Sequence, residues 1–236
     1  MQSGFEVRNN NNVIVINEQY KNVVLDKKIK IKDLPYKQNS DFFTINHHRR
    51  LHPEGGEVGT YNNKSRDWEI SLDEDTLFFA MSIHEGFNWY TFQSSPKMGN
   101  RKFIFRVPDI VYNKMDNVYM YTFKEKTTKT STYGLQIFND KSECVFDSNE
   151  KYAKVVQYSP YKLNAPFYLN YAIAINPFFF VYSGDGDKRV RPGTYSFDYN
   201  ESEGTVCVAS FIHEGLTETS VYFSSFPMML LDVTWL

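Results

Sequence analysis

Histidine and glutamate side chains are the first candidates for chemistry in this chain. His47, His48 and His52 lie close together, and Glu54 follows them. Neutral imidazole is a common zinc ligand and a base near neutral pH, so these four residues could serve a metal-dependent hydrolase. The stretch 46–59 contains one proline and three glycines, however, which favours a loop over a helix. We therefore expect a solvated surface loop and no metal site here.

A His-Glu-Gly sequence occurs twice, at 84–86 and at 213–215. A zinc protease helix needs a second histidine four residues after the first, and neither copy has one. Each copy follows a strand-like run and ends in a glycine, which permits a positive φ angle. We interpret both copies as structural corners between a strand and a turn.

Two further motifs that could bind ions or act as nucleophiles are better explained structurally. Asp185 and Asp187 alternate with glycines as in the opening of a calcium loop, but basic residues follow where the remaining ligands should stand. Cys144 and Cys207 lie in apolar, strand-like runs, which indicates small buried side chains. We therefore expect no enzyme activity, no catalytic residue, no cofactor and no metal.

Aromatic side chains are the candidate binding residues. They form 17% of the chain and gather at 87–90 and 177–182 more densely than one face of a strand can bury. Some of these rings could stack on sugars or fill a subunit interface. The alternative is a strand that is buried on both faces. The predicted contact surface consists of Trp89, Tyr90, Phe178, Phe179 and Tyr182.

The elements that must position these residues are β-strands. Apolar and polar residues alternate in 28–32 and around 206–209, and β-branched and aromatic residues fill such runs. Turn signals from Asn, Pro, Gly and Asp recur at short intervals, and no window shows helical periodicity. The sequence predicts an all-β fold.

Three landmarks recur in the same order along the chain. Residues 4–10 resemble 134–140, and the serine at 94 matches that at 224, each pair 130 positions apart. The Ile-His-Glu-Gly sequence that begins at 83 returns 129 positions later. Each copy spans about 100 residues, the usual size of a β-sandwich. The landmarks predict two tandem, Ig-like β-sandwich modules related by internal duplication.

Composition places the boundary between the predicted modules. The first module covers 1–123 and includes an extra hairpin at 102–123. The stretch 124–133 is polar and cannot build a core, so we interpret it as a linker. The second module covers 134–236.

Length, charge and hydropathy exclude several classes of protein. The chain has 236 residues and a net charge of −2, which argues against nucleic-acid binding through an overall excess of positive charge. No apolar run approaches the roughly 18 residues of a membrane span, and the first residues do not resemble a signal peptide. Two cysteines cannot form a disulfide framework, so we expect synthesis in a reducing cytoplasm.

The segments 4–9 and 133–139, each with the apolar run that follows, resemble a sequence motif in small tail-associated proteins of tailed bacteriophages. In that family a Tyr-Gly hairpin with alternating apolar residues closes in Phe-Asp-Ser, which stands here at 146–148. The turn glycine of the family is replaced by asparagines at 11–12 and by Lys-Ser at 141–142. Asparagine tolerates a left-handed conformation, and the Lys-Ser pair is less suited to it.

The resemblance implies a structural protein of the virion, located in the tail tip, fibre or baseplate region and assembled in the host cytoplasm. Its partners would be other tail proteins and further copies of itself, as a trimer or hexamer. It supplies no catalytic residues. The alternative hypothesis is a receptor- or carbohydrate-binding β-sandwich that contacts a glycan on the host surface.

Overall fold

The structure of the protein is a computed structural model. It describes the backbone of residues 6–8, 14–17, 22–39, 43–44, 60–61, 64–82, 91–93, 101–125, 131–159, 162–164, 171–175, 180–182, 190–192, 194–200, 205–210, 228–234 and 236. It describes the side chains of residues 22–38, 64–82, 101–107, 109, 112–125, 131–158, 171–174, 229–234 and 236.

Nearly all described elements are β-strands, which confirms the predicted all-β class. The described helical elements are single turns: η1 (Ile31–Asp33), α1 (Asp109–Tyr112) and η3 (Met115–Asn117). Among the described residues, no helix is long and apolar enough to cross a membrane.

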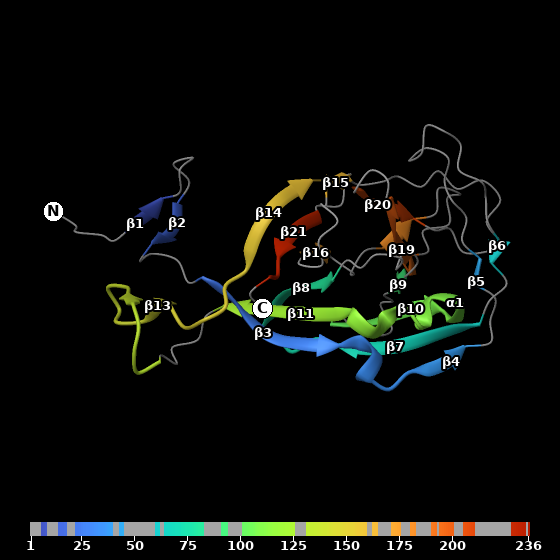
Figure 1. Ribbon diagram of the computed structural model, residues 1–236, viewed down its shortest axis with the longest axis horizontal. Helices are drawn as coiled ribbons and strands as arrows, with labels where there is room; N and C mark the ends of the chain where they lie inside the picture. Colours follow the sequence, from blue (N-terminus) through green and yellow to red (C-terminus); the bar gives the residue numbers. More distant parts are fainter. Residues whose placement is uncertain are drawn as a thin grey trace.

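Two sheets form the body of the molecule (Figure 1). The six-stranded sheet has the order β14 (Lys154–Ser159), β21 (Met228–Asp232), β16 (Tyr171–Ile175), β8 (Thr76–Ser82), β11 (Tyr119–Glu125), β3 (Val23–Lys30). The seven-stranded sheet has the order β15 (Lys162–Asn164), β20 (Thr205–Ser210), β19 (Thr194–Asn200), β9 (Thr91–Gln93), β10 (Lys102–Pro108), β7 (Ser65–Ser71), β4 (Lys37–Asn39). Neighbouring strands are antiparallel in both sheets.

Short antiparallel pairs complete the described strands. They are β1 (Glu6–Arg8) with β2 (Ile14–Asn17), β12 (Gln136–Phe138) with β13 (Cys144–Asp147), β17 (Phe180–Tyr182) with β18 (Val190–Pro192), and β5 (Phe43–Thr44) with β6 (Thr60–Tyr61). The first two pairs are the hairpins expected from the sequence. Figure 1 places both hairpins at the same end of the molecule, beside the two sheets.

Each half of the chain contributes strands in the same order to both sheets. In the six-stranded sheet the order from either edge inward is β3-β11-β8 and β14-β21-β16. In the seven-stranded sheet the order from the centre outward is β9-β10-β7 and β19-β20-β15, and β4 extends the first half. The halves join where β8 pairs with β16, with Ala80 opposite Ala174, and where β9 pairs with β19.

The two hairpins match at the predicted spacing, and the later landmarks lie outside the described residues. The pairing of Gln136 with Asp147 repeats that of Glu6 with Asn17, and the remaining pairs and the register shift repeat likewise. The Ile-His-Glu-Gly sequences lie outside the described residues, and the strands that precede them, β8 and β20, belong to different sheets.

The segment 102–123 differs from the expected hairpin. It contains strands β10 and β11, but β10 pairs with β7 and β9, whereas β11 pairs with β3 and β8. The turns α1 and η3 carry the chain from one sheet to the other. The stretch predicted as a linker also takes part in structure, since β11 ends at Glu125 and Ser131 binds the second hairpin.

Large apolar side chains fill the space between the two sheets. Phe79 of β8 and Phe103 of β10 stack with ring centroids 4.8 Å apart. Trp68 and Phe105 continue this layer with ring centroids 5.8 Å apart. All four side chains are fully buried, so this layer supplies much of the hydrophobic stabilisation.

The other face of the six-stranded sheet is also apolar, because the sheet curls and its edge strands meet at one end. Val24 forms a bridge with Tyr152, and the Ala153 N–H donates to the Val23 carbonyl at 3.0 Å. We call this contact between residues 22–25 and 151–153 the seam. Beyond it, β3 and β14 separate (Figure 1). The curled face buries a cluster formed by Ala80, Tyr121, Phe123, Ala172, Ala174, Leu231 and Val233, with Leu236 packed against it.

Candidate functional site

The predicted aromatic surface lies mostly outside the described residues. Trp89, Tyr90, Phe178 and Phe179 are not among the residues that the structure describes. Tyr182 ends strand β17, whose backbone is described and whose side chains are not. The contact surface made of these residues stays a prediction.

The candidate metal and acid–base residues lie outside the described part of the chain as well. This holds for His47, His48, His52 and Glu54, for both His-Glu-Gly sequences and for the aspartates at 185 and 187. Among the residues that are described, no group of three His, Cys, Asp or Glu side chains could hold a metal ion. Cys144 is buried, as predicted.

A buried carboxylate organises the second hairpin. Asp147 is fully buried at the end of β13, and its oxygens accept hydrogen bonds from three neighbours. The Ser131 N–H lies 2.9 Å away, the Asn149 N–H 3.0 Å and the Gln136 Nε2 3.1 Å. These bonds, first those from the Asn149 and Ser131 backbone, hold the pKa of Asp147 well below its usual range. We call Asp147 with Ser131, Gln136, Asn149 and Tyr152 the clasp.

Tyr152 connects the clasp to the seam. Its hydroxyl donates to the Asp147 carbonyl at 2.9 Å and accepts from the Asp147 N–H at 2.6 Å. Its ring stacks on Phe146 with centroids 4.9 Å apart. The Asn22 side-chain amide, at the start of β3, donates to the Val145 carbonyl at 2.9 Å. The hairpin is therefore fixed at its base to the edge of the six-stranded sheet.

Glycine is required where the chain enters the second hairpin. Gly134 has a φ of +104°, which side chains rarely adopt. A Cβ there would also lie 2.5 Å from both Asn149 Nδ2 and Ser148 Oγ. Ser148 Oγ accepts the Leu135 N–H at 3.0 Å, so it is part of the hairpin and cannot move away freely. Gly134 and Ser148 thus have structural roles in the hairpin.

The Asn139 side chain closes the turn of the second hairpin. Asn139 Oδ1 accepts the N–H groups of Lys141 at 3.0 Å and Glu143 at 2.8 Å. Ser142 adopts a φ of 62°. This is the left-handed conformation to which a Lys-Ser pair is poorly suited. The asparagine side chain compensates for this strain by closing the turn.

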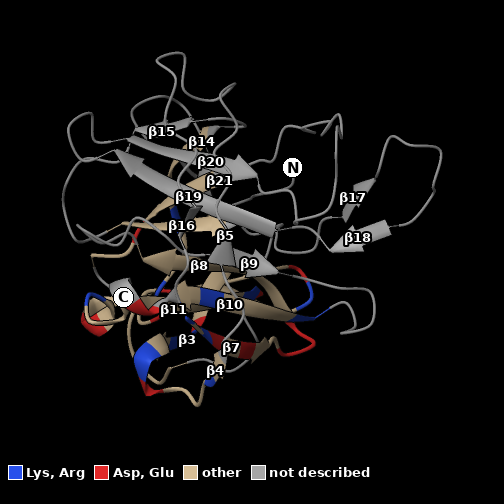
Figure 2. Ribbon diagram, turned by 90° about the vertical axis from the view of Figure 1, so that its right-hand side faces the viewer, with Lys and Arg blue, Asp and Glu red and all other residues tan. Residues whose placement is uncertain are grey.

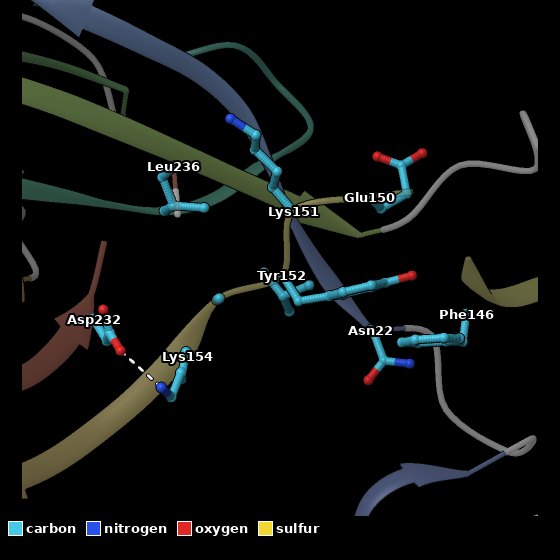
Figure 3. Close-up of a pocket in the computed structure, with 10 residues that line it drawn as sticks. Asn22, Phe146, Glu150, Lys151, Tyr152, Lys154, Asp232 and Leu236 are labelled. Atoms are coloured by element: carbon cyan, nitrogen blue, oxygen red, sulfur yellow. Dashed lines mark hydrogen bonds and ion pairs between the residues drawn. The ribbon is translucent and has the colours of Figure 1, made fainter. Parts of the chain in front are cut away.

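A cavity of about 410 Å³ lies between the hairpin base and the seam. Among the residues that line it, Lys154 and Asp232 form an ion pair, with the Lys154 Nζ 2.7 Å from an Asp232 carboxylate oxygen (Figure 3). Lys154 and then Thr234 lower the pKa of Asp232 to about 2, and burial raises the pKa of Tyr152 to about 12. The cavity is lined by Asn22, Val23, Phe146, Glu150, Lys151, Tyr152, Ala153, Lys154, Asp232 and Leu236.

Asp232 and Tyr152, two ionisable residues that line the cavity, have structural partners. Asp232 stays ionised and paired at neutral pH, and the Tyr152 hydroxyl is protonated and engaged in the clasp. Neither group is poised near neutral pH, as a general acid or base would need to be.

Several charged side chains on the described strands form ion pairs. Arg106 pairs with Asp67 at 2.6 Å, and Lys124 pairs with Asp26 at 2.6 Å. Figure 2 shows positive and negative residues interspersed over the described strands. The cations of these pairs serve the fold, as expected for a chain whose charges nearly balance.

Exposed apolar side chains are the least expected feature of the described surface. Eight large ones are exposed among the described residues, and six of them lie between positions 133 and 158. On the second hairpin Tyr133 is 74% exposed, Leu135 57% and Phe138 48%. On strand β14 the exposed residues are Val155, Val156 and Tyr158.

Sequence reasoning missed this surface because alternating apolar residues in a hairpin predict burial. Leu135, Ile137 and Phe138 all count as apolar, and of these Ile137 alone is buried. Which residue faces the solvent depends on what the hairpin packs against, and that is set by tertiary structure.

Comparison of the chain with protein-family models, with curated proteins and with solved structures finds no match.

Proposed function

We propose that this chain is a non-enzymatic structural component of a bacteriophage tail that acts through protein–protein contacts. The observation that carries the proposal is the concentration of exposed apolar side chains on the second hairpin and on β14. A concentration of large exposed apolar side chains is costly in water and marks a surface that a partner covers. The hairpin motif resembles one in tail-associated proteins of bacteriophages, and this resemblance is the reason for proposing a phage tail as the assembly.

The finer architecture belongs to the same proposal. We infer that the two halves are duplicated two-layer modules joined side by side through β8–β16 and β9–β19. The identical strand order of the halves and the identical register of the hairpins support this inference. Duplication would give each chain two similar hairpins at one end, so a trimer would present six.

Particle labelling tests the tail assignment. Tailed particles are purified from a lysate of the host, and gold-labelled antibodies raised against the purified chain are applied for electron microscopy. Label concentrated on the tail is the expected result. Particles without label, with the chain found entirely in the soluble lysate, would contradict the assignment.

A pair of variants tests whether the exposed apolar surface is what assembles. Replacing Leu135 and Phe138 by serine should prevent incorporation into particles, because the contact surface loses its apolar groups. The matched control replaces Tyr36 and Leu77, two exposed apolar residues elsewhere, by serine and should incorporate normally. Equal incorporation of both variants would argue against this surface.

A further inference from the structure

Strand β12 has an open edge. It pairs with β13 on one side, and no described strand pairs with its other side. The Ser148 N–H donates to the Leu135 carbonyl at 2.9 Å, so the Leu135 carbonyl points toward β13. Because the direction of backbone groups alternates along a strand, the N–H and C=O groups of Gln136 and Phe138 point to the outer edge. Figure 1 shows the hairpin standing beside the sheets and not between them.

This edge lacks the features that keep strand edges apart. Natural edges usually carry lysine, proline or a bulge. Residues 134–138 include no charged residue and no proline. The register shift in this hairpin places its extra residue, Val145, on β13, which leaves β12 regular. By contrast, the β3 edge of the six-stranded sheet contains three lysines within 27–30.

The same edge is complementary to itself. If two copies of β12 pair antiparallel about Ile137, Gln136 of each copy faces Phe138 of the other, and the two Ile137 residues face each other. No like charges meet in this arrangement, whereas two copies of β3 paired in the same way would bring lysines together. The exposed Leu135 and Phe138 lie at the ends of the pair, where a second strand would cover them.

We propose that the outer edge of β12 binds β12 of a second copy of this chain, which joins two hairpins into one four-stranded antiparallel sheet. This inference rests on the proposed assembly function and names the partner of its contact surface. The clasp holds the hairpin in shape before binding, so little ordering is needed when the edges meet. The resulting unit is a two-fold dimer, and three such pairs make a hexamer.

Light scattering over a concentration series tests the pairing. The full chain should form a dimer or a hexamer, and Phe138→Lys should raise the dissociation constant of the pair by roughly tenfold or more, because it places a charge at the edge. Leu77→Lys is the matched control: it changes an exposed apolar residue on β8, outside the hairpin and β14, and should leave the mass unchanged. Circular dichroism verifies that both variants are folded.

Hydrogen exchange distinguishes pairing between two copies from a purely structural role of Phe138 within one chain. The amides of Gln136 and Phe138 should become protected as the concentration of the full chain rises, and this gain should disappear in Phe138→Lys. A full chain that is monomeric at every concentration, or a trimer, or an oligomer insensitive to Phe138→Lys would overturn the pairing. The tail assignment is decided separately by particle labelling, so either idea can fail alone.

Discussion

The six-stranded sheet and the second hairpin are held together by different physical means. The curled face of the sheet buries Tyr121, Phe123 and Leu231 with almost no exposed surface. The hairpin buries a carboxylate, Asp147, and satisfies it with hydrogen bonds from a segment on each side. A two-stranded hairpin is too small to bury an apolar core of its own, so directional polar contacts must fix its shape.

This difference explains why the hairpin can expose apolar residues and remain ordered. On the curled face of the sheet, apolar side chains are buried and stabilise the fold, whereas its edge strand β14 exposes Val155, Val156 and Tyr158. In the hairpin, the clasp provides the order, so Leu135 and Phe138 are available for contact. The curled face of the sheet and the second hairpin are therefore stabilised in different ways, and the hairpin leaves Leu135 and Phe138 exposed.

The largest effect is expected from truncating the sheet core. Phe123 is fully buried and stacks on Phe78 with ring centroids 4.8 Å apart, so Phe123→Ala should lower the free energy of unfolding by about 3–5 kcal/mol. Denaturant unfolding followed by circular dichroism measures this change. Phe138→Ala, in the exposed part of the hairpin, should change it by less than about 0.5 kcal/mol. Equal losses in the two variants would remove the distinction between the regions.

A local effect is expected from breaking the clasp. Asp147→Asn keeps the size of the side chain but turns one acceptor oxygen into a donor that faces the donors of Ser131, Gln136 and Asn149. The amides of the hairpin should then exchange rapidly, while those of the central strands β8 and β16 keep their protection. Asp140→Asn, at an exposed turn position, is the control and should leave both regions protected. Loss of protection in both regions would mean that the hairpin and sheet unfold together.

Local patterns in the sequence predicted some of the strands but not their partners. The repeated landmarks located both hairpins, and alternation of apolar residues indicated strands at 28–32 and around 206–209, because these signals depend on neighbours along the chain. The pairing of Ala80 with Ala174 joins residues far apart in sequence, and nothing in either local pattern specifies it. Ser131 likewise looked like part of a polar linker, because its role depends on a carboxylate that becomes its partner through folding.

Acid should weaken the polar region through its depressed carboxyl pKa values. Asp232 has a pKa of about 2, below the value of about 4 in an unfolded chain, so its stabilising effect is complete above pH ~4 and is lost as the pH falls toward 2. The pKa of Asp147 is depressed in the same direction. Asp232→Asn should remove part of the pH dependence in this window.

The size of the Asp232 contribution is limited by solvent. Lys154 is 66% exposed, so we expect about 1 kcal/mol from the pair at neutral pH. Urea unfolding at pH 7, 4 and 2.5 measures it in the natural chain and in Asp232→Asn. An identical decline in stability for both proteins would show that Asp232 does not contribute, and the core variant Phe123→Ala should keep the natural pH dependence.

The smallest effect is expected at the turn of the hairpin, where a gain should result. Ser142 has a φ of 62°, which costs a side chain free energy that glycine does not incur, but glycine also loses more conformational entropy on folding. The balance favours Ser142→Gly by about 0.5 kcal/mol, measured as slower exchange of the hairpin amides. Asp140→Gly, two positions earlier and without a positive φ, should lower the protection instead. A weaker hairpin in Ser142→Gly would contradict this expectation. It would mean that the Ser142 side chain itself stabilises the turn, and that hydrogen bonding by Asn139 is not the main stabiliser.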